Sequence, residues 1–217
     1  MSFARDRDLL VLEPNLFRDI GWTGQRLVDV ASATLTGKTL TLPGVDLAAL
    51  GVGEGNVAVV GGAALEVIAR LSATTLQVSR LREDPGGAPI PPLAVSGVSA
   101  QVWTFGPQIR SAHERVLRMV GIEPDVGGRA PTGGVLGESA VVNRRAVARA
   151  EALAALHVIF AAGAAAATED SLLWRKAESY RERFAEERRR LEVAVDLDGD
   201  GLADAVRRPT VAALVRG

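Results

Sequence analysis

The sequence contains no cysteine, which excludes disulfide bridges, thiolate metal sites and a cysteine nucleophile. Aromatic residues make up only 4% of the 217 residues, whereas alanine, valine, leucine and glycine are abundant. A core of small aliphatic side chains lets helices approach closely, but each contact buries little apolar area. The length allows one large domain or two small ones.

An excess of charge of one sign is also lacking, because 25 basic and 26 acidic residues leave a net charge of −1. There is therefore no global positive field to hold nucleic acid. The first residues are charged and lack an apolar core, so we expect no secretion signal. The longest apolar run, Ala152–Ala167, is mostly alanine and contains His157 and Gly163. We expect a buried helix there and no membrane span, since the run is too short to cross a bilayer comfortably.

A period of two residues dominates the sequence up to residue 106. Short apolar or alternating runs are separated by turns that contain glycine, such as Thr36-Gly37-Lys38. The pattern predicts a small antiparallel β-barrel or sandwich. The expected strands are Leu9–Leu12, Arg26–Leu35, Thr39–Leu42, Asn56–Val60, Ala64–Ala69, Thr74–Val78 and Val98–Phe105. Residues 85–92, rich in proline and glycine, should form an exposed loop, and Asp46–Leu50 a single helical turn.

At Pro107 the period changes to about 3.6 residues, which predicts helices. We expect a helix from Pro107 to Val120, a second from Ser139 to Ala162 and a third from Asp170 to Glu192, with a long mobile loop over residues 121–138. The predicted fold class is therefore α+β. A β-rich domain (residues 1–106) precedes a helical domain (residues 107–217) of about three helices, which ends in an extended arm (residues 209–217).

The third predicted helix carries an apolar stripe, and its other faces are dense in arginine and glutamate. We expect the stripe to pack inward against the second helix. Mixed charges on the other faces favour a helix that faces solvent or forms salt bridges with neighbouring subunits, and disfavour a nucleic-acid-binding face. The stripe consists of Leu173, Ala177, Tyr180 and Phe184.

After this helix comes an acidic turn, the segment Asp196–Asp204. Its alternating Asp196, Asp198 and Asp200, followed by glycine, resemble the first half of a calcium-binding loop. The bidentate acid expected at the twelfth loop position is replaced by Arg207, and this removes a main source of calcium affinity. We therefore predict a structural turn without a tightly bound metal. Its repelling carboxylates would be offset by the N–H groups of the two glycines or by the arginines that follow.

No catalytic constellation is found elsewhere in the sequence. His113 and His157 both lie in apolar helical contexts, where a packed or interface histidine is the expected role. The segment Gly51-Val52-Gly53-Glu54-Gly55 lacks the lysine and the following helix of a phosphate-binding loop, so a turn is expected there. We expect neither an enzyme nor a bound cofactor.

The helical half resembles the head-tail connector (adaptor) proteins of tailed bacteriophages, which also occur in bacterial gene-transfer particles. The resemblance covers residues 107–217, and its specific part is Trp174–Asp204. It rests on the order of the helices, on Trp174-Arg175-Lys176-Ala177 and Tyr180-Arg181-Glu182-Arg183-Phe184, and on the acidic turn that follows. The β-rich half departs from the minimal helical adaptor, and we interpret it as an added barrel that decorates the assembly.

The resemblance implies a structural protein of the virion neck, made in the host cytoplasm. Such proteins form a homo-oligomeric ring, by resemblance a dodecamer, that binds the portal protein and a tail or stopper protein and lets DNA pass without sequence-specific binding. No membrane partner is implied. We expect the C-terminal arm to bind a partner through Thr210, Val211, Leu214 and Val215. The rival hypotheses are a calcium-dependent binding module that uses residues 196–204 and an accessory subunit of an enzyme.

Overall fold

A computed structural model describes residues 2–124, 135–165 and 171–209 of the chain. The chain divides into two compact units. One is Arg5–Gly106, and the other combines Met1–Ala4 with Pro107–Gly217. The fold is α+β, with an antiparallel barrel in the first half and helices in the second, and this confirms the sequence-based prediction in outline.

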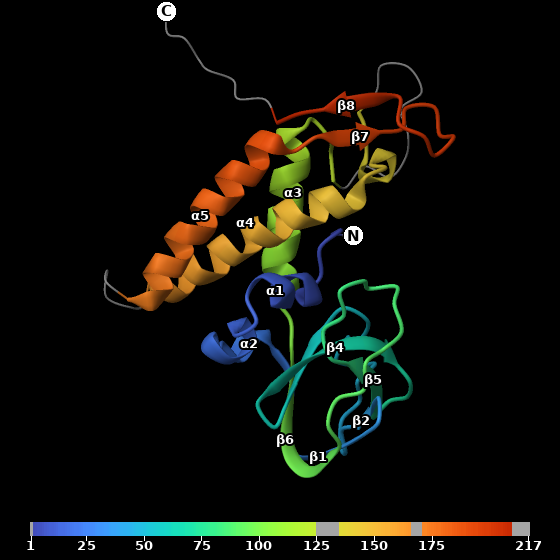
Figure 1. Ribbon diagram of the computed structural model, residues 1–217, viewed down its shortest axis with the longest axis vertical. Helices are drawn as coiled ribbons and strands as arrows, with labels where there is room; N and C mark the ends of the chain where they lie inside the picture. Colours follow the sequence, from blue (N-terminus) through green and yellow to red (C-terminus); the bar gives the residue numbers. More distant parts are fainter. Residues whose placement is uncertain (1, 125–134, 166–170, 210–217) are drawn as a thin grey trace, which may run out of the picture. The chain divides into compact units, whose positions relative to one another are not determined.

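The first unit is a closed barrel of six antiparallel strands in the order β1-β2-β5-β4-β3-β6 (Figure 1). The barrel alternative is therefore correct, and the sandwich is not. Six of the expected strands are present within a few residues of their predicted ends. They are β1 (Arg26–Thr36), β2 (Thr39–Thr41), β3 (Val57–Val60), β4 (Ala63–Arg70), β5 (Thr75–Ser79) and β6 (Val95–Trp103).

The barrel interior is filled by aliphatic side chains from every strand, among them Leu40, Leu76 and Val102. Closure requires the strands to bend. The long strand β1 pairs with β2 near one end and with β6 over most of its length, and its register with β6 shifts at three places. Such irregularities increase the local twist and let a strand turn around a small barrel.

The expected strand Leu9–Leu12 is wrong. These residues end helix α1 (Asp6–Leu12), which is followed by the short helix α2 (Leu16–Asp19) and a 3-10 turn, η1 (Thr23–Gln25). The Asp8 carboxylate accepts a hydrogen bond from the Arg5 N–H (2.8 Å) and so caps the start of α1. A run of four apolar residues is too short to show whether its period is that of a helix or that of a strand.

Two buried carboxylates tie the ends of this unit to the barrel. Asp6 accepts hydrogen bonds from the Phe105 N–H (2.6 Å) and the Asn56 side chain (3.0 Å), and burial raises the pKa of Asp6 to about 6. Glu66 of β4 bonds Arg7 of α1 (2.7 Å) and Arg82 (2.6 Å). Arg82 also donates to the carbonyl of Gly87, so the irregular loop at residues 85–92 is held against the barrel.

The second unit contains helix α3 (Gly106–Met119), the 3-10 turn η2 (Glu138–Ala140), helices α4 (Arg144–Ala164) and α5 (Leu172–Arg190), and a hairpin of β7 (Val193–Val195) and β8 (Ala205–Arg207). The expected start of the second helix at Ser139 is wrong, since η2 and a short bridged segment precede α4. Ser171 caps α5 by accepting the Trp174 N–H. The hairpin β7–β8 was not predicted.

Helices α4 and α5 run antiparallel and pack along their lengths (Figure 1). Three members of the predicted stripe, Ala177, Tyr180 and Phe184, are buried, and the fourth lies half-buried near the start of α5. Tyr180 stacks on Phe160 of α4 with ring centroids 5.6 Å apart. The inward packing of the stripe is therefore confirmed.

The predicted mobile loop over residues 121–138 is packed at both described ends. Ile122 and Leu136 are buried, and the Glu123 N–H donates to the Leu136 carbonyl (2.8 Å). Residues 125–134, its middle, lie outside the described residues.

Phe184→Ala should lower the free energy of unfolding by about 3 kcal/mol, because the phenyl group is buried and its loss leaves a cavity. Urea unfolding of the full chain measures this. The matched control is Leu172→Ala in the same helix, where the side chain is 61% exposed and little change is expected. Equal effects of the two substitutions would show that the stripe is not core.

Candidate functional site

A buried ionisable cluster lies in the helical unit. Glu151 of α4 is fully buried, and its Oε1 lies 2.7 Å from Nδ1 of His113 on α3. The other imidazole nitrogen, Nε2, lies 3.0 Å from Glu138 Oε2 of η2. His113 is thus a packed histidine, as expected, but the two glutamates that flank it were missed. They lie 38 and 25 residues away in sequence, so local spacing gave no signal.

The surroundings of His113 favour its protonated form. Burial lowers the pKa of the imidazole, but hydrogen bonds and charge from Glu151 and then Glu138 raise it above its ordinary value. Both ring nitrogens face carboxylate oxygens, and only the imidazolium can donate to both. With His113 protonated, the cluster links two carboxylates through one imidazolium inside an alanine-rich core.

The same glutamate also holds the N-terminal segment. Glu151 Oε2 accepts the N–H groups of Phe3 (3.0 Å) and Ala4 (2.8 Å). The Phe3 phenyl group meets the His113 imidazole edge-on at 5.1 Å and lies beneath the Arg144 guanidinium at 5.5 Å. These contacts explain why Met1–Ala4 belongs with the helices and not with the adjoining barrel. The cluster is covered by the chain itself, which indicates a structural role.

The acidic turn forms the loop of the β7–β8 hairpin. Both Asp196 oxygens accept backbone N–H groups, from Gly199 and from Gly201 (2.9 Å). Asp204 accepts the N–H of Leu197 (2.6 Å), and Asp200 accepts that of Leu202 (2.7 Å). The prediction that glycine N–H groups offset the carboxylate charges is therefore confirmed, and the loop is held by its own side chains.

The arginines that follow the loop bind elsewhere. Arg207 donates to the carbonyls of Val120 (3.3 Å) and Gly121 (3.0 Å) at the end of α3, and Arg208 pairs with Glu192. The expectation that these arginines neutralise the aspartates is wrong. Gly121 has a φ of +67°, and a Cβ there would lie 2.9 Å from the Arg207 guanidinium, so glycine suits both the helix end and this contact.

Three carboxylates of the loop come together, though not the three that the sequence indicated. Oxygens of Asp196, Asp198 and Asp204 all lie within 4.8 Å of one another, whereas Asp200 is not part of this group. This is the arrangement of the described residues that a cation would fit best. Its carboxylates are already engaged with backbone N–H groups, which lowers their need for an ion.

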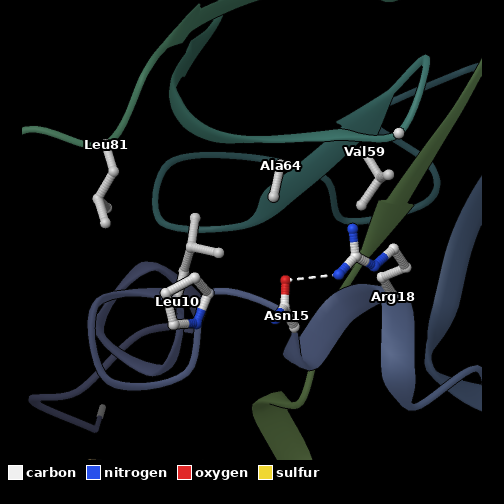
Figure 2. A pocket seen from close by; sticks show the side chains of 8 residues that line it. Leu10, Asn15, Arg18, Val59, Ala64 and Leu81 are labelled. Carbon is white, nitrogen blue, oxygen red and sulfur yellow. Dashed lines mark hydrogen bonds between the residues drawn. The ribbon is translucent and has the colours of Figure 1, made fainter.

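An open hollow of about 260 Å³ lies on the barrel unit between the α1–α2 segment and the β3–β4 hairpin. Figure 2 shows Leu10, Val59, Ala64 and Leu81 around it, with Arg18 at its edge. The Arg18 guanidinium donates to the Asn15 side chain (2.7 Å) and lies 4.0 Å from the Asp19 carboxylate, and the arginine side chain remains largely exposed. The hollow thus combines apolar walls with an exposed arginine at its edge, and the charge of this arginine is offset in part by Asp19.

A second hollow, of about 300 Å³, lies between the end of α4 and the start of α5. It is lined by alanines together with His157, Glu178 and the half-exposed Trp174. His157 donates from Nδ1 to the Ala177 carbonyl (3.1 Å), which fixes its orientation as a packed histidine.

The proposed partner-binding residues Thr210, Val211, Leu214 and Val215 lie outside the described residues. Among the described helices, α4 is long and apolar enough to cross a membrane by length and composition. More than half of its apolar window is buried within the structure, which favours the core helix that we expected. Comparison of the chain with protein-family models, curated proteins and solved structures finds no match.

His113→Gln should destabilise the protein by about 3 kcal/mol near pH 6.5, since it leaves buried Glu151 without its positive partner. The folded-state pKa of His113 is raised, so its contribution is complete below the unfolded value of about 6.5 and is lost as the pH rises through the folded value. The stability gap between wild type and variant should therefore narrow with rising pH. Urea unfolding of both proteins from pH 6.5 upward measures this gap, and Asp6, which titrates near pH 6, is present in both proteins, so its contribution cancels. A gap that does not depend on pH would contradict the charged network.

Calcium should bind the acidic loop only weakly, with a dissociation constant above the micromolar range. The loop lacks the bidentate acid, and its carboxylates already accept backbone N–H groups. Isothermal titration of the full chain measures this, with Asp198→Asn as the control. Micromolar or tighter binding that Asp198→Asn removes would overturn this interpretation and favour the calcium-module hypothesis.

Proposed function

We propose that the chain is a structural adaptor of a tailed phage or a phage-like gene-transfer particle. It forms a homo-oligomeric ring, a dodecamer by resemblance, in the neck of the particle. The ring joins the portal protein to a tail or stopper protein and lets DNA pass. The observation that carries the proposal is helix α5 together with the hairpin that follows it, the part with the specific resemblance to the adaptor family.

This α5–hairpin segment has the surface chemistry of an assembly element. One face of α5 is buried against α4, and large apolar side chains are exposed near both ends of the segment. At the start of α5 these are Leu172 and Trp174, and on the hairpin they are Leu197, Leu202 and Val206. Between these ends the exposed surface of α5 is highly charged. Exposed apolar anchors surrounded by polar surface are typical of protein–protein interfaces.

The charged surface of α5 suits subunit register more than affinity. Glu178 pairs with Arg181, and Glu186 pairs with Arg190, along the helix, while Glu187 pairs with Arg149 of α4 (3.2 Å). Exposed pairs of this kind contribute little to stability. At a subunit boundary they select the partner and its register. A net charge of −1 is consistent with a channel that does not grip DNA.

The remaining parts extend the same proposal. The barrel decorates the ring, and the C-terminal arm (residues 209–217) docks on the portal through its apolar residues, as an added strand or in a groove. The protein has no catalytic role and needs no cofactor. The calcium module remains the second candidate, favoured by the approach of Asp196, Asp198 and Asp204.

Deletion of the arm, residues 209–217, should leave the monomer folded and abolish assembly with the portal ring, because the arm supplies the apolar contacts with the portal. Co-sedimentation with purified portal rings and negative-stain images of the mixture measure binding, and circular dichroism reports folding. The matched control is the full-length chain with Arg216→Ala, which keeps the apolar residues. Normal portal binding by the truncated chain would remove the arm from the proposal.

A further inference from the structure

The loop between β7 and β8 presents a leucine in a fixed position. Leu202 is 69% exposed, although the backbone N–H groups around it are held by carboxylates of the same loop. A segment that is already ordered loses little conformational entropy when it docks. Exposed acids flank the leucine, with Asp200 two residues before it. The loop is therefore a preorganised apolar plug with negative charge beside it.

The hollow on the barrel unit has the complementary chemistry. Its walls are apolar, formed in part by Leu10, Val59 and Leu81, and its edge carries the guanidinium of Arg18 (Figure 2). Apolar cavities of about 150 Å³ accept a benzene-sized group. The hollow is open to solvent, and its volume of about 260 Å³ leaves room for one leucine side chain.

We propose that the acidic loop of one copy docks into the barrel hollow of a neighbouring copy, with Leu202 in the hollow and Asp200 paired with Arg18. Two observations favour a second copy as the occupant. Asp200 and Arg18 are both exposed and carry opposite charges, and the loop and the hollow belong to different units of the chain. Such a contact is heterologous, so it propagates from copy to copy until the assembly closes. The inference rests on the proposed ring and names an interface within it.

The absence of cysteine in the sequence allows a direct test by disulfide trapping. Two single variants of the full chain, Ala64→Cys in the hollow and Leu202→Cys on the loop, are mixed under mild oxidation. We expect a cross-linked heterodimer in the mixture at least tenfold more abundant than in either variant alone. The matched control replaces Ala64→Cys with Leu93→Cys. Leu93 lies on the barrel unit but is not among the residues that line the hollow. Its side chain is 85% exposed, so random collisions between chains would cross-link a cysteine there more readily than one in the hollow.

Equal cross-linking of the Leu93→Cys control, or no cross-link in the mixture, would overturn the proposed contact. A double variant that forms its disulfide only within a monomer would also overturn it. Sedimentation velocity of the unoxidised wild-type chain shows whether rings form at all, and so it tests the adaptor proposal separately from this contact. Rings without the Ala64–Leu202 cross-link would remove only this interface, whereas a chain that stays monomeric would contradict the ring as well.

A charge exchange tests the polar half of the contact without cysteine. Arg18→Glu or Asp200→Arg alone should weaken assembly at least tenfold, and the two variants mixed or combined should recover most of it. Both positions are exposed, so the fold should be retained, and circular dichroism checks this. Asp200 also accepts the Leu202 N–H, so Asp200→Asn, which keeps an acceptor oxygen but not the charge, is the control for the loss of that bond. Single variants that assemble normally, or a combination without recovery, would contradict the pairing.

Discussion

The helical unit depends on one buried carboxylate. Glu151 lies within an alanine-rich helix that offers little apolar area for packing, and it binds the N-terminal segment and His113 of α3 at once. Through His113 it also reaches Glu138 in the turn before α4. A buried charge is costly unless it is paired and fully hydrogen-bonded, so the segments that meet Glu151 are fixed in position by its need for partners.

The barrel unit contains two further buried carboxylates that join distant segments. Asp6 ties the start of the unit to its last residues through Phe105, and Glu66 joins α1 to the loop that follows β5 through Arg7 and Arg82. Each carboxylate links segments that are far apart in sequence. Large apolar side chains remain exposed at several places on the described surface, and those at the ends of the α5–hairpin segment are the ones that the adaptor proposal uses.

Elements with a sustained period were predictable from the sequence, and elements defined by distant contacts were not. The six barrel strands and the inward stripe of α5 follow from apolar spacing alone. Helix α1 was missed because Leu9–Leu12 is too short to show a period, and β7 and β8 because each spans only three residues around a nine-residue loop. The partners of His113 were missed because they depend on how α3, η2 and α4 come together. In the acidic turn, the role of the glycines followed from local chemistry. The role of Arg207 did not, because its guanidinium donates to the carbonyls of Val120 and Gly121 at the end of α3.

The helical half combines a resemblance to the adaptor family with exposed apolar groups at both ends of the α5–hairpin segment. We propose that the chain closes into a ring. Native mass spectrometry of the purified full-length chain over a range of concentrations tests that claim most directly. The account predicts one discrete oligomer of fixed subunit number that does not grow as the concentration rises. A monomer at every concentration, or a continuous series of ever larger polymers, would contradict it.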